Sequence, residues 1–301
     1  MKLPKILKAC RVEEGGRFKL SDCDPAENYG LAIDKDEVKS MLADGIAQLA
    51  DLQERLYAQD RWAVLVILQA MDAAGKDSVV KHVMSGINPQ GCEVHAFKEP
   101  SHEELQHDFL WRAATRLPPR GRIGIFNRSY YEEVLVVRVH PHLLGEERLP
   151  QEHAGKKIWK HRFEAIRGFE RYLVRNGILV LKFHLRLSRE EQRKRFLSRI
   201  DEPAKRWKFS MNDVQERKYW NDYMAAYEEM ISETSTSYAP WYVVPADYKH
   251  ITWLVVAAAI VEALDRLDLK FPRISPAKLK ELKAAEKALL AEAPRQGAER
   301  K

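Results

Sequence analysis

Cysteine is scarce in this chain of 301 residues, which contains only Cys10, Cys23 and Cys92. The three are odd in number, far apart in the sequence, and form no Cys-x-x-Cys pair. Neither a disulfide framework nor a cysteine zinc site is therefore supported. We expect reduced thiols, as in a protein of the cytoplasm.

The chain also lacks a long apolar run. Its best candidate, residues 253–261, stops at Glu262 and is far too short to span a bilayer, so it predicts a buried helix. The first residues, "MKLPKILKACRVEEGG", carry lysines, and Pro4 interrupts their apolar stretch, which makes a poor signal peptide. We expect a cytoplasmic protein with no membrane partner.

A phosphate-binding signature is present with both of its ends missing. In residues 68–77, "LQAMDAAGKD", Ala70 stands where the usual loop has its first Gly, and Asp77 stands where it has Ser or Thr. The context still fits, because an apolar run precedes the loop and helical spacing resumes after Gly75. Backbone N–H groups at a helix N-terminus favour phosphate, and Lys76 would add a point charge on a terminal phosphate. The alternative is an ordinary strand-to-helix turn with an exposed lysine.

Carboxylates stand close to this loop. Asp72 and Asp77 flank Lys76, and two bare carboxylates beside a phosphate make sense only with a cation between them, typically Mg²⁺. A second buried strand, "RIGIF", ends at Asn127 and Arg128 and is followed by "SYYEE". In a parallel sheet, that end lines the ligand crevice. The alternative for each acidic residue is a carboxylate in the first turn of a helix.

Basic residues gather in one stretch of the chain. Residues 182–208 hold ten basic and four acidic residues, and residues 275–301 hold seven and four, in a chain of net charge +6. A cationic segment inside a globular chain indicates a polyanionic partner. On a helix, Arg195 and Arg199 would form one ridge that could cover phosphates. A solvated surface helix is the alternative.

The alternation of patterns predicts an α/β fold with a parallel sheet covered by helices on both faces. We expect a loosely packed arm to about Asn28, a core over 61–272 with a basic lid over 188–233, and a charged tail over 273–301. The N-terminal part, residues 1–60, would combine the arm with a long helix. Expected strands are 61–70, 92–97, 122–126, 177–185 and 240–246. Expected helices are 34–59, one after Gly75, 101–116 with a Ser101/Glu104 capping box, one from Ser129, 156–175, 188–200, 211–233 and 249–267.

Several long stretches between residues 62 and 267 resemble the polyphosphate kinase 2 family. They are "QAMDAAGKDSVVKHVMSGINPQG", "FKEPSHEELQHDFLWR", "GRIGIFNRSYYEEVLVVRVHP", "EEQRKRFLSRIDEPAKRWKFSMND" and "PWYVVPADYK". The resemblance implies a P-loop kinase fold similar to that of thymidylate kinases. It also implies reversible, Mg²⁺-dependent transfer of a phosphoryl group between inorganic polyphosphate and a nucleotide, with Mn²⁺ as an alternative metal.

The same resemblance assigns residues to roles. Asp72, Lys76 and Arg128 would be catalytic, and Asp72, Glu132 and Asn127 would hold the metal. The expected substrate-binding residues are Ala73, Ala74, Gly75, Asp77, Ser78, Lys81, Lys98, Arg112, Arg195, Arg199 and Lys208. The expected partners are polyphosphate and purine nucleotides, without nucleic acid, and we expect a homo-oligomer, either a dimer or a tetramer.

One departure from the family pattern concerns acceptor choice. Members that prefer nucleoside diphosphates often carry Asp-Arg-Ser-(Trp/Tyr)-Tyr-Asn-Arg, where this chain has "NRSYYEE" from Asn127 to Glu133. This form resembles the subgroup that accepts both AMP and ADP, with GMP and GDP left open. Asn127 in place of an aspartate shifts the expected metal role toward Glu132.

Two other functions remain open from sequence alone. An ATP-dependent nucleoside monophosphate kinase could be built on the same fold, and competition between donors would separate it from a polyphosphate enzyme. A non-catalytic P-loop protein could use the basic segment to bind nucleic acid, with salt-dependent affinity and no turnover. Against the latter, the basic residues lack the interleaved aromatic pattern of single-strand binders.

Overall fold

The apolar run before the glycine-lysine loop forms the centre of a six-stranded sheet. The computed structural model describes residues 3–16, 18–31 and 35–292, without the side chains of Lys35 and Lys208. Strand β2 (Ala63–Gln69) is buried at every position and lies between β4 (Ile123–Asn127) and β5 (Ile178–Arg186), parallel to both. The strand order is β1-β6-β5-β2-β4-β3. The outer strands are β3 (Cys92–Ala96), β6 (Trp241–Pro245) and β1 (Arg11–Val12), of which only β1 runs antiparallel.

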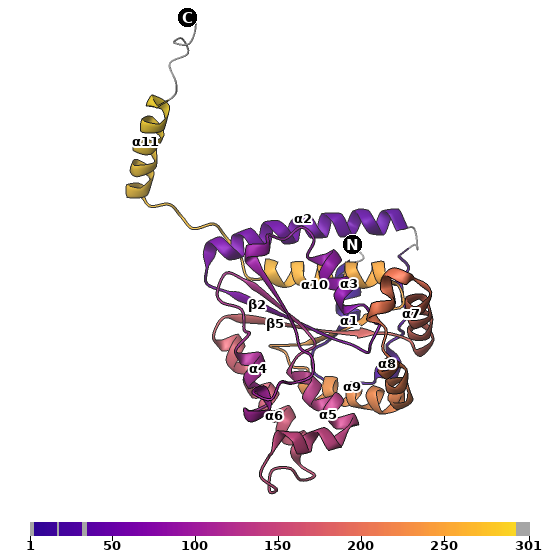
Figure 1. Cartoon of the computed structure of the whole chain (residues 1–301). Coiled ribbons are helices and arrows are strands. Elements are labelled where there is room, and N and C mark those ends of the chain that lie inside the picture. The colour runs from indigo at the N-terminus through magenta and orange to yellow at the C-terminus, as the bar shows by residue number, and fades with distance from the viewer. Residues whose placement is uncertain (1–2, 17, 32–34, 293–301) are drawn as a thin grey trace, which may run out of the picture.

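Helices cover both faces of this sheet (Figure 1). One face carries α1 (Leu3–Cys10), α2 (Lys35–Gln59), α3 (Lys76–Val83) and α10 (Lys249–Asp265). The other carries α4 (Trp111–Ala114), α5 (Val136–Val139), α6 (Ile158–Arg175) and α9 (Trp220–Thr234). Side chains of β2 alternate between the two cores, with Val66 on the α10 side and Ile67 on the α6 side. The predicted α/β architecture is thus confirmed.

Two further helices and a set of short turns complete the description. Helices α7 (Arg189–Asp201) and α8 (Met211–Glu216) lie together at one end of the sheet, and α11 (Pro276–Ala291) stands away from the body (Figure 1). The 3₁₀ helices are Leu20–Asp22, Pro89–Gly91, Glu104–Gln106, Tyr130–Val134, Pro141–Glu147, Pro203–Lys208 and Arg217–Tyr219. In the described residues, no helix is long and apolar enough to cross a membrane.

The predicted helix over 101–116 is wrong in its length. The capping box itself forms, since the N–H of Ser101 donates to Oε2 of Glu104 at 2.7 Å and the N–H of Glu104 donates to Oγ of Ser101 at 3.2 Å. The chain then leaves the helix, because Asp108 accepts from the N–H of Leu110 at 3.0 Å and so offers the backbone a competing turn. Only the 3₁₀ helix Glu104–Gln106 and the short α4 remain.

Two other predicted helices are broken. The segment after Ser129 is the 3₁₀ helix Tyr130–Val134 followed by α5, and the predicted helix over 211–233 is divided into α8, a 3₁₀ turn and α9. Both breaks border the cavity described below. The predicted helix over 156–175 is confirmed as α6.

The described part of the N-terminal arm is well packed, which corrects the expectation of a loose segment. Ile6, Leu7 and Cys10 of α1 are buried against the α10 core, and Arg11 pairs with Tyr242 of β6. The i, i+3 and i+4 spacing of these apolar residues was present in the sequence and indicates an amphipathic helix. All three cysteines are free thiols, as predicted.

Strand β5 places a histidine in the interior next to positive charge. His184 is 1% exposed, and its ring centroid lies 4.3 Å from that of Tyr227. Burial, followed by the positive charge of Arg186 and then of Lys76, lowers the pKa of His184 from 6.5 to about 3. The ring is therefore neutral in the folded protein at any pH at which an exposed histidine begins to titrate.

Replacing His184 with glutamine should flatten the pH dependence of the free energy of unfolding between about pH 6 and pH 4. In this window the unfolded chain binds a proton at residue 184 and the folded chain does not, so wild-type stability falls with decreasing pH. The contribution of this residue is about 1.4 kcal/mol per pH unit. Urea unfolding at several pH values measures the slope. His161→Gln, at an exposed position of α6, is the control and should keep the wild-type slope. An unchanged slope in His184→Gln would contradict a neutral buried ring.

Candidate active site

The loop between β2 and α3 has the backbone of a phosphate-binding loop. Two residues adopt left-handed conformations, Ala73 with φ 64° and Gly75 with φ 110°, where Gly75 is the residue before the first turn of α3. A φ of 110° strains any residue with a Cβ, which explains the glycine. The loop therefore leads directly into a helix N-terminus, whose free N–H groups favour an anion.

Lys76 lies at the first position of α3 and is folded back onto the loop. It is 8% exposed, and its Nζ donates to the carbonyl oxygens of Ala70 at 2.7 Å and Met71 at 3.4 Å. Burial, with a smaller effect of the Arg128 charge, lowers the pKa of Lys76 to about 8. A phosphate bound beside Lys76 would favour the protonated, positively charged form of its amine. The buried Lys76 side chain is therefore suited to an anionic ligand.

Arg195 clamps this loop from behind. Its guanidinium donates to the carbonyls of Ala73 at 3.1 Å and Ala74 at 2.9 Å, and to those of Ala246 at 2.6 Å and Asp247 at 3.0 Å. The residue is only 8% exposed. The expectation that Arg195 faces polyphosphate from a lid is therefore not supported by its position, since its donors are directed to protein carbonyls. We infer that Arg195 holds the loop between β2 and α3 in place.

A second α7 residue holds the same loop and was missed from sequence. Gln192 is 1% exposed and donates through Nε2 to the carbonyl of Asp72 at 2.9 Å. Arg217 donates to Oε1 of Gln192 at 2.6 Å and so fixes the amide. An isolated glutamine on a charged helix carries no sequence signal, because only the tertiary fold brings α7 to the loop.

Arg128 lies between two of the predicted carboxylates. Its Nη2 donates to Oδ1 of Asp72 at 2.7 Å, and its Nη1 lies 3.7 Å from Oε2 of Glu132. Glu132 also accepts from Nε2 of Gln69 at 2.8 Å. The negative charge of Glu132, and then that of Asp72, raise the pKa of Arg128 although burial opposes them, so it remains a cation. Three candidate residues from two distant parts of the chain are thus brought into one cluster beside Lys76.

Asn127 and Asp77 form a neighbouring pair. Nδ2 of Asn127 donates to Oδ1 of Asp77 at 2.8 Å, which links the carboxyl end of β4 to the first turn of α3. The side-chain carbonyl oxygen of Asn127 remains available as an uncharged ligand for a cation. At the position where the family resemblance leads one to expect an aspartate, this chain therefore has an uncharged amide, and this amide is hydrogen-bonded to Asp77.

A cavity of about 540 Å³ opens beside the cluster. This volume lies within the usual range for small-molecule sites. The carboxyl ends of β2 and β4 form its floor through Asp72 and Arg128, and α8 and α9 form one wall through Asp213 and Tyr227. The broken segment 97–112 and the 3₁₀ helix Pro141–Glu147 close the opposite end.

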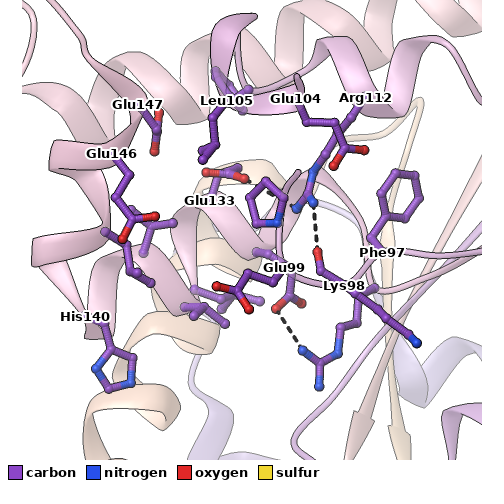
Figure 2. A pocket seen from close by; sticks show the side chains of 18 of the residues that line it. Phe97, Lys98, Glu99, Glu104, Leu105, Arg112, Glu133, His140, Glu146 and Glu147 are labelled. Atoms are coloured by element: carbon purple, nitrogen blue, oxygen red, sulfur yellow. Dashed lines mark hydrogen bonds and ion pairs between the residues drawn. The ribbon is translucent and has the colours of Figure 1, made fainter. Parts of the chain in front are cut away.

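Buried charges build that far wall. Arg112 donates to the carbonyl of Lys98 at 2.8 Å and lies 3.6 Å from Glu133, and both arrangements are visible in Figure 2. Arg162 lies 3.5 Å from Glu133 and also pairs with Glu147. Burial and the charge of Glu147 raise the pKa of Glu133 to about 7, although both arginines oppose this. Arg112 therefore supports the wall rather than standing free for a substrate phosphate.

The other predicted residues are distributed around the site. Lys98 lines the cavity and is exposed, whereas Ser78 and Lys81 lie on α3 outside its lining. Arg199 is 27% exposed and lies 4.0 Å from Asp213 of the cavity wall. The side chain of Lys208 lies outside the described part of the chain.

The predicted basic segment is only partly a surface. Of its ten basic residues, Lys182 and Arg195 are buried, with 0% and 8% exposure. Arg189, Arg193 and Lys194 remain exposed on α7. Charge counting alone could not separate these groups, because it takes no account of which helix face packs on the loop.

The chain matches the model of a known family over most of its length. The model, "Polyphosphate kinase 2 (PPK2)", covers residues 32–272. An "ADP-polyphosphate phosphotransferase" of Rhodopseudomonas palustris is 52% identical over 284 residues, which are 94% of this chain and 98% of that protein. An "AMP/ADP-polyphosphate phosphotransferase" of Meiothermus ruber is 43% identical over 267 residues, or 89% of this chain and 96% of that protein.

A solved structure agrees with this match. The crystal structure of polyphosphate kinase 2 from Arthrobacter aurescens TC1 superimposes with a TM-score of 0.83 at 39% sequence identity, over 96% of this chain and 97% of that one. The expected P-loop kinase fold is thereby confirmed.

Arg195→Ala should lower the free energy of unfolding by about 3 kcal/mol, because it leaves four carbonyls and Glu191 without their cation. Hydrogen exchange should accelerate at the loop amides of residues 73–76. The matched control is Arg193→Ala on the same helix, whose exposed pair with Glu190 should contribute little to stability. Equal stability loss in the two variants would refute the clamp.

Proposed function

The chain belongs to the polyphosphate kinase 2 family, and from this premise we propose that it transfers phosphoryl groups between inorganic polyphosphate and the purine nucleotides AMP and ADP. The observation that carries the proposal is the cluster of Asp72, Arg128 and Glu132, which lies between the phosphate-type loop and a cavity of about 540 Å³. This arrangement offers one place for a phosphate chain and one for a nucleotide, with charged groups between them.

The residues of the chain would act mainly by position and charge. Phosphoryl transfer through a loose transition state requires in-line alignment and neutralisation of oxygen charge rather than covalent chemistry. The N–H groups that open α3 would bind phosphate oxygens, and Lys76 would turn from the Ala70 carbonyl to a phosphate. Arg128 would exchange one carboxylate for a phosphoryl oxygen.

The donor set fits a hard divalent cation. Carboxylate oxygens of Asp72 and Glu132, with the amide oxygen of Asn127, are the ligands that Mg²⁺ prefers, and Mn²⁺ shares them. Within the described ranges no three His, Cys, Asp or Glu side chains form a metal site by themselves. Substrate phosphates would therefore complete the coordination. The cation would supply neutralisation of the phosphate oxygens.

The exposed cationic side chains of the predicted lid suit a phosphoryl donor that has no nucleobase, such as polyphosphate. Arg189, Arg193 and Lys194 are exposed on α7, the helix whose Gln192 and Arg195 hold the loop. A linear polyanion needs only such a track, whereas ATP needs a second base pocket. We further propose that the core spans residues 61–272, between an N-terminal unit of 1–60 and a tail of 273–301. A cytoplasmic, homo-oligomeric state remains part of the proposal.

Lys76→Ala and Asp72→Asn should each lower turnover by a factor of about 100 or more, because each removes a charge beside the transferred phosphate. The assay contains Mg²⁺, polyphosphate and either AMP or ADP, and the nucleotides formed are separated and counted. Lys287→Ala, at an exposed position of α11, is the control and should keep wild-type turnover.

The same assay with ATP in place of polyphosphate decides the donor. Phosphorylation of AMP by polyphosphate supports the proposal. Phosphorylation by ATP alone would make the chain a nucleoside monophosphate kinase. Normal turnover in folded Lys76→Ala or Asp72→Asn would overturn the site.

Glu132→Asn should impair AMP phosphorylation more than ADP phosphorylation. A monophosphate brings fewer oxygens to the cation than a diphosphate, so the protein must supply the missing negative ligand. Asparagine keeps an oxygen donor but loses the charge. The ratio of kcat/KM for AMP and ADP measures the effect, and a ratio equal to that of the wild type would exclude a selective role of Glu132.

A further inference from the structure

Two consecutive tyrosines precede the carboxylate cluster and are fastened to one buried glutamate. Tyr130 and Tyr131 are each 0% exposed. Their hydroxyls both donate to Oε1 of Glu170 on α6, at 2.9 Å and 2.7 Å. Burial and the Glu170 charge raise the pKa of both phenols well above 10, so each keeps its proton and remains a donor.

Lys182 of β5 completes this network. Its Nζ lies 2.7 Å from Oε2 of Glu170 and donates to the hydroxyl of Tyr131 at 3.1 Å and to the carbonyl of Thr234 at 2.7 Å. Both charged side chains are 0% exposed. Trp241 covers them, with its ring 4.8 Å from that of Tyr131 and its Nε1 donating to Oγ1 of Thr234 at 2.9 Å.

A fully buried ion pair is a poor source of stability. The cost of removing two charges from water is of the same order as their attraction, and apolar replacements are often as stable. What the pair does supply here is geometry. It directs two hydroxyls of adjacent residues to one oxygen atom, and it joins α6, β5 and α9 to the turn Tyr130–Val134.

The turn needs such support because it starts from a strained residue. Arg128 has φ 64°, a left-handed conformation that is costly for a residue with a Cβ. Its N–H donates to the carbonyl of Leu68 at 3.0 Å, and Ser129 accepts through Oγ from the N–H of Tyr131 at 3.2 Å. The backbone on one side of Arg128 is thus fixed by β2, and on the other side by the tyrosines.

We propose that Glu170, Lys182, Tyr130 and Tyr131 form a positioning network that holds Arg128 and Glu132 opposite Asp72. The inference rests on the proposed function of that cluster. None of the four residues lines the cavity, so the network would act only through Arg128 and Glu132. A displacement of about 1 Å in a reacting group can cost a factor of 100 in rate, which is the scale on which the network would matter.

Removal of a single hydroxyl tests the proposal. Tyr131→Phe, and separately Tyr130→Phe, should lower kcat with AMP at least tenfold while KM for polyphosphate stays within twofold of the wild type. The matched control is Tyr238→Phe, which deletes a hydroxyl that donates to the carbonyl of Arg167 at 3.0 Å in the same helical layer. The control should keep kcat within twofold of the wild type. Similar kcat in all three variants would overturn the network.

A double-mutant cycle separates positioning from general loosening. In the Glu132→Asn background, Tyr131→Phe should lower kcat by a clearly smaller factor than in the wild type, because residues that act through one another are not additive. Equal factors in both backgrounds would show that Tyr131 does not act through Glu132.

A measurement that does not depend on catalytic turnover distinguishes failure of the network from failure of the proposed function. If the wild type transfers no phosphate from polyphosphate, the proposed function fails. Hydrogen exchange at residues 128–133 then decides the network alone. Faster exchange in Tyr131→Phe than in Tyr238→Phe supports it, and equal exchange overturns it.

Discussion

One arginine between two carboxylates sets the geometry on which the site depends. Arg128 leaves the carboxyl end of β4, Asp72 leaves that of β2, and the two meet at 2.7 Å because these strands are parallel neighbours at the centre of the sheet. Glu132 joins from the turn that follows. Any phosphate or cation that binds here must compete with this ion pair, so the cluster is held in place before substrates arrive and can exchange partners when they do.

The charges of the chain divide into two sets with different tasks. Arg195 and Lys182 are buried and bind protein groups, which fixes the loop and the tyrosine turn. Arg189 and Arg193 are exposed, and their surface partners Arg217 and Glu190 can be exchanged for a mobile polyanion. Buried donors cannot rearrange without losing several hydrogen bonds, whereas exposed side chains adapt at little cost. A rigid centre next to an adaptable surface suits a compact acceptor and a long donor.

Sequence patterns correctly predicted those features of the fold that depend on neighbouring residues in the chain. The strand–loop–helix around Gly75 and the alternation of strands and helices follow from periodicity and from the few residues that tolerate positive φ. The helix predicted over 101–116 failed where Asp108 offered the backbone another partner. The roles of Gln192 and Glu170 could not be predicted, since their partners lie 120 and about 40 residues away and no spacing rule links them. The basic residues of 182–208 do not form one cationic surface, as their number had indicated, because tertiary packing buries Lys182.

The central claim is that the Asp72–Arg128–Glu132 cluster is where phosphoryl transfer takes place. A crystal structure with Mg²⁺, an ADP analogue and a non-transferable polyphosphate tests it most directly. We expect phosphate oxygens at the amides of residues 73–76 and the nucleotide in the cavity of about 540 Å³, with the 2.7 Å contact between Asp72 and Arg128 opened by ligands. Ligands bound elsewhere, with that contact intact, would show that phosphoryl transfer does not take place at this cluster.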